Sequence, residues 1–184
     1  MRTAKFTLLT IWVITIAAAL AAAQTEVFVP GNASGFFGNP VNIQVPLVPA
    51  ISVSGPAKIT VTYVSGTVDF GPGEQVGPNG VPYTAGESDQ VPLQEAVGVS
   101  SPTSTNMAAL IGVFVPQSRV KKAGFSALDG TKNVTPIGIM PNGLFFIGTG
   151  KTISVHHAGT LFLGINDGGV ADNRGGFEVT VTAQ

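Results

Sequence analysis

Apolar residues recur at every second position along three separate stretches of the chain, residues 58–63, 160–165 and 177–182. In the last stretch, one side of the alternation is formed by Phe177, Val179 and Val181. A period of two residues is typical of a β-strand, in which successive side chains point to opposite faces. The pattern therefore predicts three strands, each buried on one face only.

Shorter apolar runs between turn signals such as Pro141-Asn-Gly143 predict further strands. The chain has 24 glycines and 13 prolines, which interrupt helices, whereas its Val, Ile, Thr and Phe residues favour strands. The additional predicted strands are residues 41–48, 108–115, 134–140, 144–147 and 151–155. Because about eight strands are enough for two packed sheets, we predict an all-β fold, an antiparallel β-sandwich of the jelly-roll type.

The start of the chain has the layout of a cleavable signal peptide. Arg2 and Lys5 are basic, residues 6–20 are mostly apolar, and Ala21-Ala-Ala23 supplies the small residues of a cleavage site. An uncleaved anchor helix is the alternative interpretation. We predict residues 1–23 to be a signal peptide, and therefore expect a secreted protein, extracellular or periplasmic, without a membrane span in the mature chain.

Cleavage after Ala23 would leave residues 24–184, a length that suits one globular domain with a sizeable core. Residues 24–50 are rich in Gly, Asn and Phe in their first half and predict a leading strand or an arm. The main β-domain is predicted to span residues 51–184.

Charge and cysteine content exclude several classes of function. The chain has ten acidic and nine basic residues, and no stretch concentrates positive charge, so nucleic acid is not an expected partner. Cysteine is absent, which excludes disulfides, thiolate metal sites and cysteine nucleophiles. No Gly-x-Ser-x-Gly motif supports a hydrolase. We therefore expect a protein that is not an enzyme.

The loop between the last two alternating stretches carries the strongest candidate chemistry. Asp167, Asp172 and Asn173 lie close together there among several glycines. Carboxylate and amide oxygens are hard donors of the kind that Ca²⁺ prefers, and a glycine-rich turn lets main-chain carbonyls join them. An ordinary hairpin turn is the alternative interpretation, because Asp, Asn and Gly are also common turn residues.

Two separated motifs are similar to segments of a known family. The final motif, Gly159-Thr-Leu-Phe-Leu-Gly-Ile-Asn-Asp167 followed by Asp172-Asn-Arg-Gly-Gly-Phe-Glu-Val-Thr-Val181, resembles the C-terminal hairpin of the calcium-dependent galactophilic lectins (PA-IL-like). Upstream, Ser65-Gly-Thr-Val-Asp-Phe-Gly-Pro-Gly-Glu-Gln-Val-Gly-Pro-Asn-Gly80 resembles the family segment that passes the metal. The resemblance covers the chain from about residue 51 to the C-terminus and implies a small β-sandwich that binds galactose through one Ca²⁺.

The same resemblance implies a set of metal ligands. Asp167 matches a bidentate carboxylate, Asp172 and Asn173 match a consecutive pair of amide ligands, and Phe70 matches a donor of a main-chain carbonyl. The Asp at position 172 keeps an oxygen donor and adds charge. Vicinal hydroxyls of a galactoside would then complete the coordination of the ion.

The chain also departs from the family pattern. The loop between Asp167 and Asp172 is two residues shorter, and the sugar-contacting His-Pro-Asp-Gln segment has only a loose counterpart in Ser88-Asp-Gln90. An additional segment lies near residues 116–135. The expected sugar contacts are Asp167, Asp172, Asp89, Gln90 and Val170.

From the sequence we therefore expect a secreted, calcium-dependent, lectin-like protein that recognises galactose-type or similar sugars. The alternative is a calcium-stabilised structural or adhesive subunit of a surface, matrix or filament that binds no sugar. In that case, Phe36, Phe37 and the apolar N-terminal region would form the contacts of a homo-oligomer or polymer.

Overall fold

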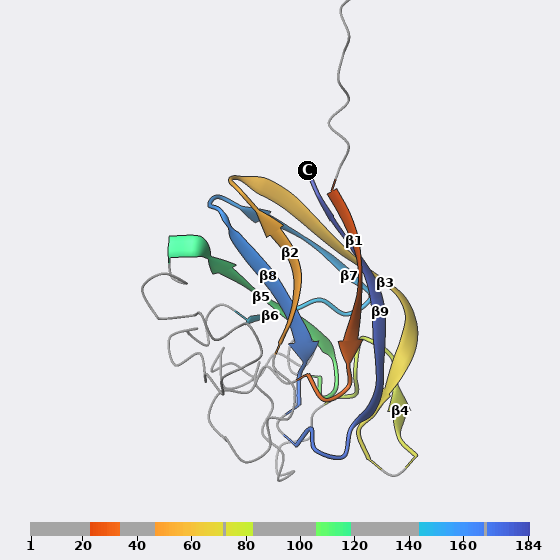
Figure 1. The fold of residues 1–184 in the computed structure, drawn as a ribbon. Helices are drawn as coiled ribbons and strands as arrows, with labels where there is room; N and C mark the ends of the chain where they lie inside the picture. The colour runs from red at the N-terminus through yellow and green to blue at the C-terminus, as the bar shows by residue number, and fades with distance from the viewer. Residues whose placement is uncertain (1–22, 34–46, 72, 83–105, 119–143, 168) are drawn as a thin grey trace, which may run out of the picture.

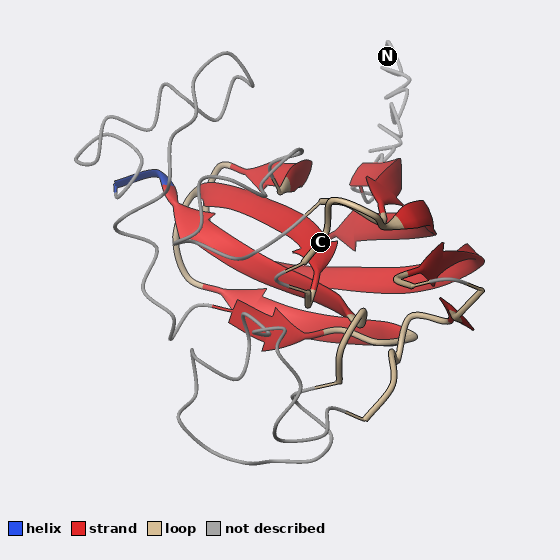
Figure 2. Ribbon diagram, turned by 90° about the horizontal axis from the view of Figure 1, so that it is seen from below, coloured by secondary structure: helices blue, strands red, loops and turns tan. Residues whose placement is uncertain are grey.

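The computed structural model describes residues 23–33, 47–71, 73–82, 106–118, 144–167 and 169–184. These residues form nine strands in two sheets, and every strand pairing is antiparallel. The strands are β1 (Ala23–Pro30), β2 (Val48–Val53), β3 (Ala57–Asp69), β4 (Gln75–Val76), β5 (Leu110–Pro116), β6 (Leu144–Phe146), β7 (Gly150–Val155), β8 (Gly159–Ile165) and β9 (Arg174–Ala183). In Figure 2, strands dominate the described part of the chain, and a short helical segment at residues 117–118 follows β5. The predicted all-β class is confirmed.

The strands divide between two sheets of similar size (Figure 1). Sheet 1 has the order β1-β9-β3-β4, and β7 also pairs with β3. Sheet 2 has the order β2-β8-β5-β6. The strands β8 and β9, which are joined by the candidate loop, belong to different sheets, so that loop passes from one sheet to the other.

Several strands predicted from the hydrophobic pattern are present. Residues 58–63, 160–165 and 177–182 lie within β3, β8 and β9, and the predicted strands at 108–115, 144–147 and 151–155 match β5, β6 and β7 within two residues. Residues 134–140 and 41–46 lie outside the described residues. Most of β2 was not predicted, because Pro49 and Gly55 interrupt the apolar run around it.

The N-terminal strand expected in residues 24–50 is present as β1. Val27 and Val29 of β1 are buried, and Ala23 pairs with Ala183 at the far end of β9. The rest of the predicted signal peptide lies outside the described residues. Among the described residues, we find no helix with the length and apolar character needed to cross a membrane.

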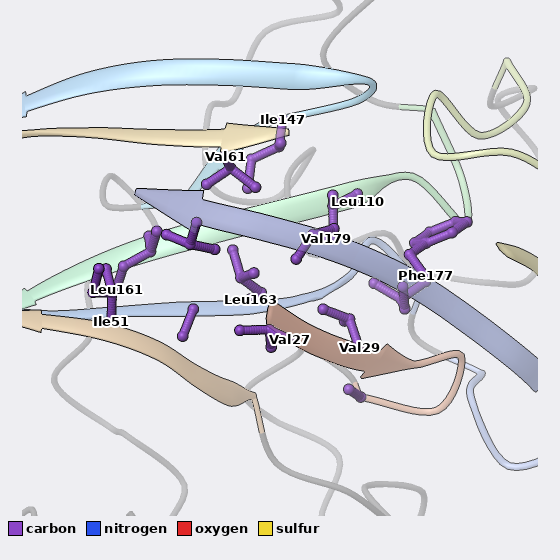
Figure 3. Packing of buried hydrophobic residues seen from close by; sticks show 14 of the residues in the cluster. Val27, Val29, Ile51, Val61, Leu110, Ile147, Leu161, Leu163, Phe177 and Val179 are labelled. Carbon is purple, nitrogen blue, oxygen red and sulfur yellow. The ribbon is translucent and has the colours of Figure 1, made fainter. Parts of the chain in front are cut away.

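Both sheets contribute side chains to one large hydrophobic cluster. Phe177, Val179 and Val61 come from sheet 1, and Leu161 and Leu163 come from sheet 2 (Figure 3). These side chains are at most 2% exposed, so the alternating apolar positions of β3, β8 and β9 do face a shared core. Burial of this apolar surface is the dominant stabilising term for the fold.

The face of sheet 2 that points away from the large hydrophobic cluster is also buried, which differs from the prediction. Phe162 of β8 and Ile111, Val113 and Val115 of β5 form a second buried cluster with Leu47 and Leu144. Residues 160–165 were expected to be buried on one face only, and this was wrong. The alternation in this stretch is incomplete, because Phe162 and Gly164 occupy the positions where a strand with one exposed face would carry polar residues.

A bulge in β3 sets the register of the β3–β9 pairing on the side of the candidate loop. The β3–β9 register shifts between Tyr63 and Ser65, and Gly66 follows with φ of 101°. A Cβ atom at Gly66 would clash with the carbonyl oxygen of Gly176. Glycine is therefore required here by both backbone conformation and space.

We expect Gly66→Ala to lower the free energy of unfolding by about 2–4 kcal/mol, through the strained φ and the clash together. Gly55→Ala is the matched control, because no atom lies within 4 Å of a Cβ there and its φ is not in the left-handed region. Urea unfolding of both variants measures the difference. Equal stabilities for the two variants would contradict the assigned backbone constraint.

Candidate functional site

The candidate loop, residues 166–173, lies at one end of the two sheets. In Figure 1 it lies at the lower end, where β1 and β8 end and β3 turns toward β4. The turn after β1 joins both sheets there, because the Gly31 amide donates to the Gly175 carbonyl and the Ile165 amide donates to the Ala33 carbonyl. The loop is therefore held against a turn from the opposite end of the sequence.

Asp167 and Asn173 lie together inside this end of the molecule. Asp167 is 3% exposed and Asn173 is 4% exposed. Asn173 Nδ2 donates a hydrogen bond of 2.9 Å to Asp167 Oδ2, and the Gly169 amide donates one of 2.8 Å to Asp167 Oδ1. Burial of a carboxylate is costly unless hydrogen bonds or a cation compensate for lost hydration. The loop supplies such hydrogen bonds to both carboxylate oxygens.

The Asn173 amide has an unambiguous orientation. Its Nδ2 also donates to the Gly31 carbonyl at 2.9 Å, so both hydrogens of the amide are used. The reverse orientation would place Oδ1 against two acceptor oxygens. Asn173 Oδ1 therefore faces the other way, where it is buried and receives no hydrogen bond from the described residues. A buried acceptor without a donor needs a ligand, a water molecule or an ion.

Asp172 has a different environment from its two neighbours in the predicted ligand set. Its side chain is exposed, and its main-chain carbonyl accepts a 3.0 Å hydrogen bond from Arg174 Nη1. The same guanidinium nitrogen donates to the Asn173 carbonyl at 3.0 Å. Arg174 therefore fixes the main chain of the loop from the solvent side, and the Asp172 carboxylate remains at the surface.

Phe70 follows the last residue of β3, and Asn173 precedes the first residue of β9. The β3–β9 pairing ends with Asp69 opposite Arg174, so these two residues come directly after and before the last pair. The Phe70 ring packs against the large hydrophobic cluster, which fixes this part of the chain. The role of the Phe70 carbonyl as a metal ligand stays a prediction.

Of the remaining predicted sugar contacts, only Val170 lies within the described residues. The Val170 carbonyl accepts a hydrogen bond from the main-chain N–H of Asn173. Val170 is 0% exposed, so in this conformation it presents no surface to a sugar. Asp89 and Gln90 lie outside the described residues. We therefore build the site on Asp167, Asn173 and the loop main chain.

The described residues contain no group of three or more His, Cys, Asp or Glu side chains that could hold a metal ion. A cation at the loop would depend on one buried carboxylate together with amide and main-chain oxygens, a donor set that suits Ca²⁺ better than a transition metal. Such a mixed set contains too few ionisable groups to form a cluster of that kind.

Two contributors to the site were not predicted from the sequence. Gly31 takes part through its main-chain carbonyl, for which no residue type is diagnostic; the Pro30-Gly31 pair indicates only a turn. Arg174 was not singled out because its role depends on the direction of its side chain toward two carbonyls.

No model of a known protein family matches the chain, and the search of curated proteins returns no similar sequence. The likeness to the galactophilic lectins therefore depends on the sequence motifs alone and stays a prediction.

Proposed function

We propose that the protein is a secreted, non-enzymatic β-sandwich of the galactophilic lectin type, which binds Ca²⁺ at the loop 166–173 and a carbohydrate through that ion. The observation that carries the proposal is the buried Asn173 Oδ1, an acceptor without a donor from the described residues. A cation on that side of the amide would satisfy this oxygen and would balance the charge of the neighbouring Asp167 carboxylate.

The ligand roles follow from the burial of each residue. Asp167 and Asn173 are buried and would hold the ion from the interior, whereas Asp172 is exposed and would complete its coordination from the solvent side. The Phe70 carbonyl is the fourth proposed donor. Two vicinal hydroxyls of a galactoside would replace water on the exposed side of the ion. A single site of this type binds weakly, so useful affinity would require several copies presented together.

Isothermal titration calorimetry with methyl β-D-galactopyranoside tests this function. We expect binding heat in the presence of calcium and none at the loop site in the presence of chelator, because the hydroxyls would coordinate the ion directly. Methyl β-D-glucopyranoside is the matched control, since it differs in the orientation of one hydroxyl. Equal heats for both sugars, or none for either in calcium, would contradict a galactose-selective site.

The burial of the site favours a second candidate function. An ion enclosed by Asp167 and Asn173, which are 3% and 4% exposed, would have few coordination positions open to a sugar. In this case the ion would only stabilise the fold, and the protein would be a structural or adhesive subunit. Sedimentation velocity separates the candidates, because it detects extended assembly. Extended assembly and calcium-dependent stability, together with an absence of sugar binding, would support the structural role.

A further inference from the structure

A second candidate binding surface lies on the outer face of sheet 1, away from the large hydrophobic cluster. Phe28 of β1 is 49% exposed, although most large apolar side chains of the described strands are buried. It lies on the face opposite the buried residues Val27 and Val29 of the same strand. Glu178 of β9 is directly opposite Phe28 in the strand register, and it is also exposed.

The Phe28 ring lies over the sheet instead of pointing away from it. A Cβ atom placed on Gly176 would come within 2.6 Å of Phe28 Cζ and within 2.8 Å of Cε2. The far end of the ring therefore covers Gly176, which is two residues from Glu178 on β9. Only glycine leaves room for this arrangement, in which the ring rests on the backbone and keeps about half of its surface open to solvent.

The surroundings of the ring are polar. Glu26 of β1 and Thr180 of β9 form the next cross-strand pair on the same face, and Ser65 of β3 lies on the other side of Glu178. These side chains offer carboxylate and hydroxyl groups within one or two strand spacings of the ring, about 5–10 Å. An aromatic face bordered by hydrogen-bonding groups suits a ligand that is apolar on one side and hydroxylated at its edge.

We propose that Phe28 and Glu178 form a second, cation-independent carbohydrate contact, in which a pyranose ring stacks on Phe28 and donates hydroxyl hydrogen bonds to the Glu178 carboxylate. Galactosides fit this chemistry because one face of the galactose ring carries adjacent C–H groups. A stable protein partner fits less well, since a specific interface buries about 800 Å² on each side around an apolar core, and one half-exposed ring does not supply such a core.

The proposal takes carbohydrate as the ligand class from the proposed function, but it does not require the ion. The two contacts lie toward the same end of the β1–β9 pair but on different faces: Phe28 is on the outer face of sheet 1, whereas the side-chain amide of Asn173 is buried beside Gly31. Two weak contacts on one molecule would raise the avidity for a branched or polymeric sugar.

A titration of isotope-labelled protein with methyl β-D-galactopyranoside, followed by NMR in the presence of chelator, tests the proposal. We expect the ring signals of Phe28 and the amide signals of residues 176–178 to shift at sugar concentrations up to roughly 50 mM, with fast exchange. The amide signals of residues 167–173 should shift only after calcium is added. Failure of the calcium-dependent shifts alone would contradict the loop site and leave the Phe28 contact standing.

Phe28→Leu should abolish the shifts at residues 176–178, because it removes the aromatic face and keeps an apolar cover over Gly176. Val64→Ala is the control for the loss of an exposed apolar side chain on the same sheet, since Val64 of β3 is 61% exposed. Glu178→Gln keeps the aromatic ring and should reduce the shifts at least several-fold. Absence of shifts near Phe28 in the wild type, or unchanged shifts in Phe28→Leu, would overturn the proposal.

Discussion

Asp167→Ala is expected to abolish the calcium dependence of thermal stability and to destabilise the fold in chelator. The side chain is 3% exposed and accepts hydrogen bonds from Asn173 Nδ2 and the Gly169 amide, so its removal leaves two donors without this acceptor. The expected loss in chelator is about 2–4 kcal/mol. In calcium, the wild type should gain further stability by mass action, whereas the variant should gain none. Differential scanning calorimetry with and without calcium measures both effects.

Asp172→Ala and Asn173→Asp test the same site by the same measurement as Asp167→Ala. Asp172 is exposed, so its replacement should leave stability in chelator almost unchanged and weaken only the calcium effect. Asn173→Asp would place acceptor oxygens against the Gly31 carbonyl and the Asp167 carboxylate, which should destabilise the protein in chelator. Calcium should restore much of that loss. If the wild type melts at the same temperature in calcium and in chelator, the metal site is wrong.

Phe177→Ala should cause the largest loss of stability among the core substitutions, about 3–5 kcal/mol. The ring lies in the large hydrophobic cluster (Figure 3) and is 0% exposed. It packs edge-to-face against Tyr63, with ring centroids 6.0 Å apart. The substitution removes this contact and leaves a cavity in the large hydrophobic cluster, next to the bulge in β3. The midpoint of urea unfolding measures the loss.

Val64→Ala provides a control for Phe177→Ala on the same sheet. Val64 is 61% exposed, so its truncation should change the free energy of unfolding by less than about 0.5 kcal/mol. Phe177→Leu should lie between the two, because it retains apolar volume but loses the aromatic contact. A loss below about 1 kcal/mol for Phe177→Ala would show that the cluster repacks around the missing ring.

The sequence predicted the strands whose side chains alternate clearly. In β9, the apolar positions Phe177, Val179 and Val181 are all buried, because one face of the strand meets the core and the other meets solvent. In β8, the same reasoning was wrong, since Phe162 is buried in a second cluster. Alternation therefore identifies a strand more reliably than it identifies how many of its faces are covered.

The candidate site was predictable only in part, for a comparable reason. Asp167 and Asn173 belong to one short loop, so local sequence was enough to place them together. The Gly31 carbonyl lies 142 residues from Asn173 in the sequence and acts through the main chain, so no residue type identifies it. Asp172 is exposed and Asn173 is buried, although they are adjacent in the sequence. This difference depends on the backbone conformation of the loop, which the residue types do not determine.

The pairing of β1 with β9 determines the orientation that the molecule would have if it were attached to a surface through the start of β1 or the end of β9. Ala23 lies opposite Ala183, while Pro30 and Gly176 lie at the other end of the same strand pair, roughly 25 Å away along eight residues of strand. A tether or fusion partner joined near Ala23 or Ala183 would therefore sit at the end remote from loop 166–173. Immobilised through either point, the protein would present that loop outward, toward the surrounding medium.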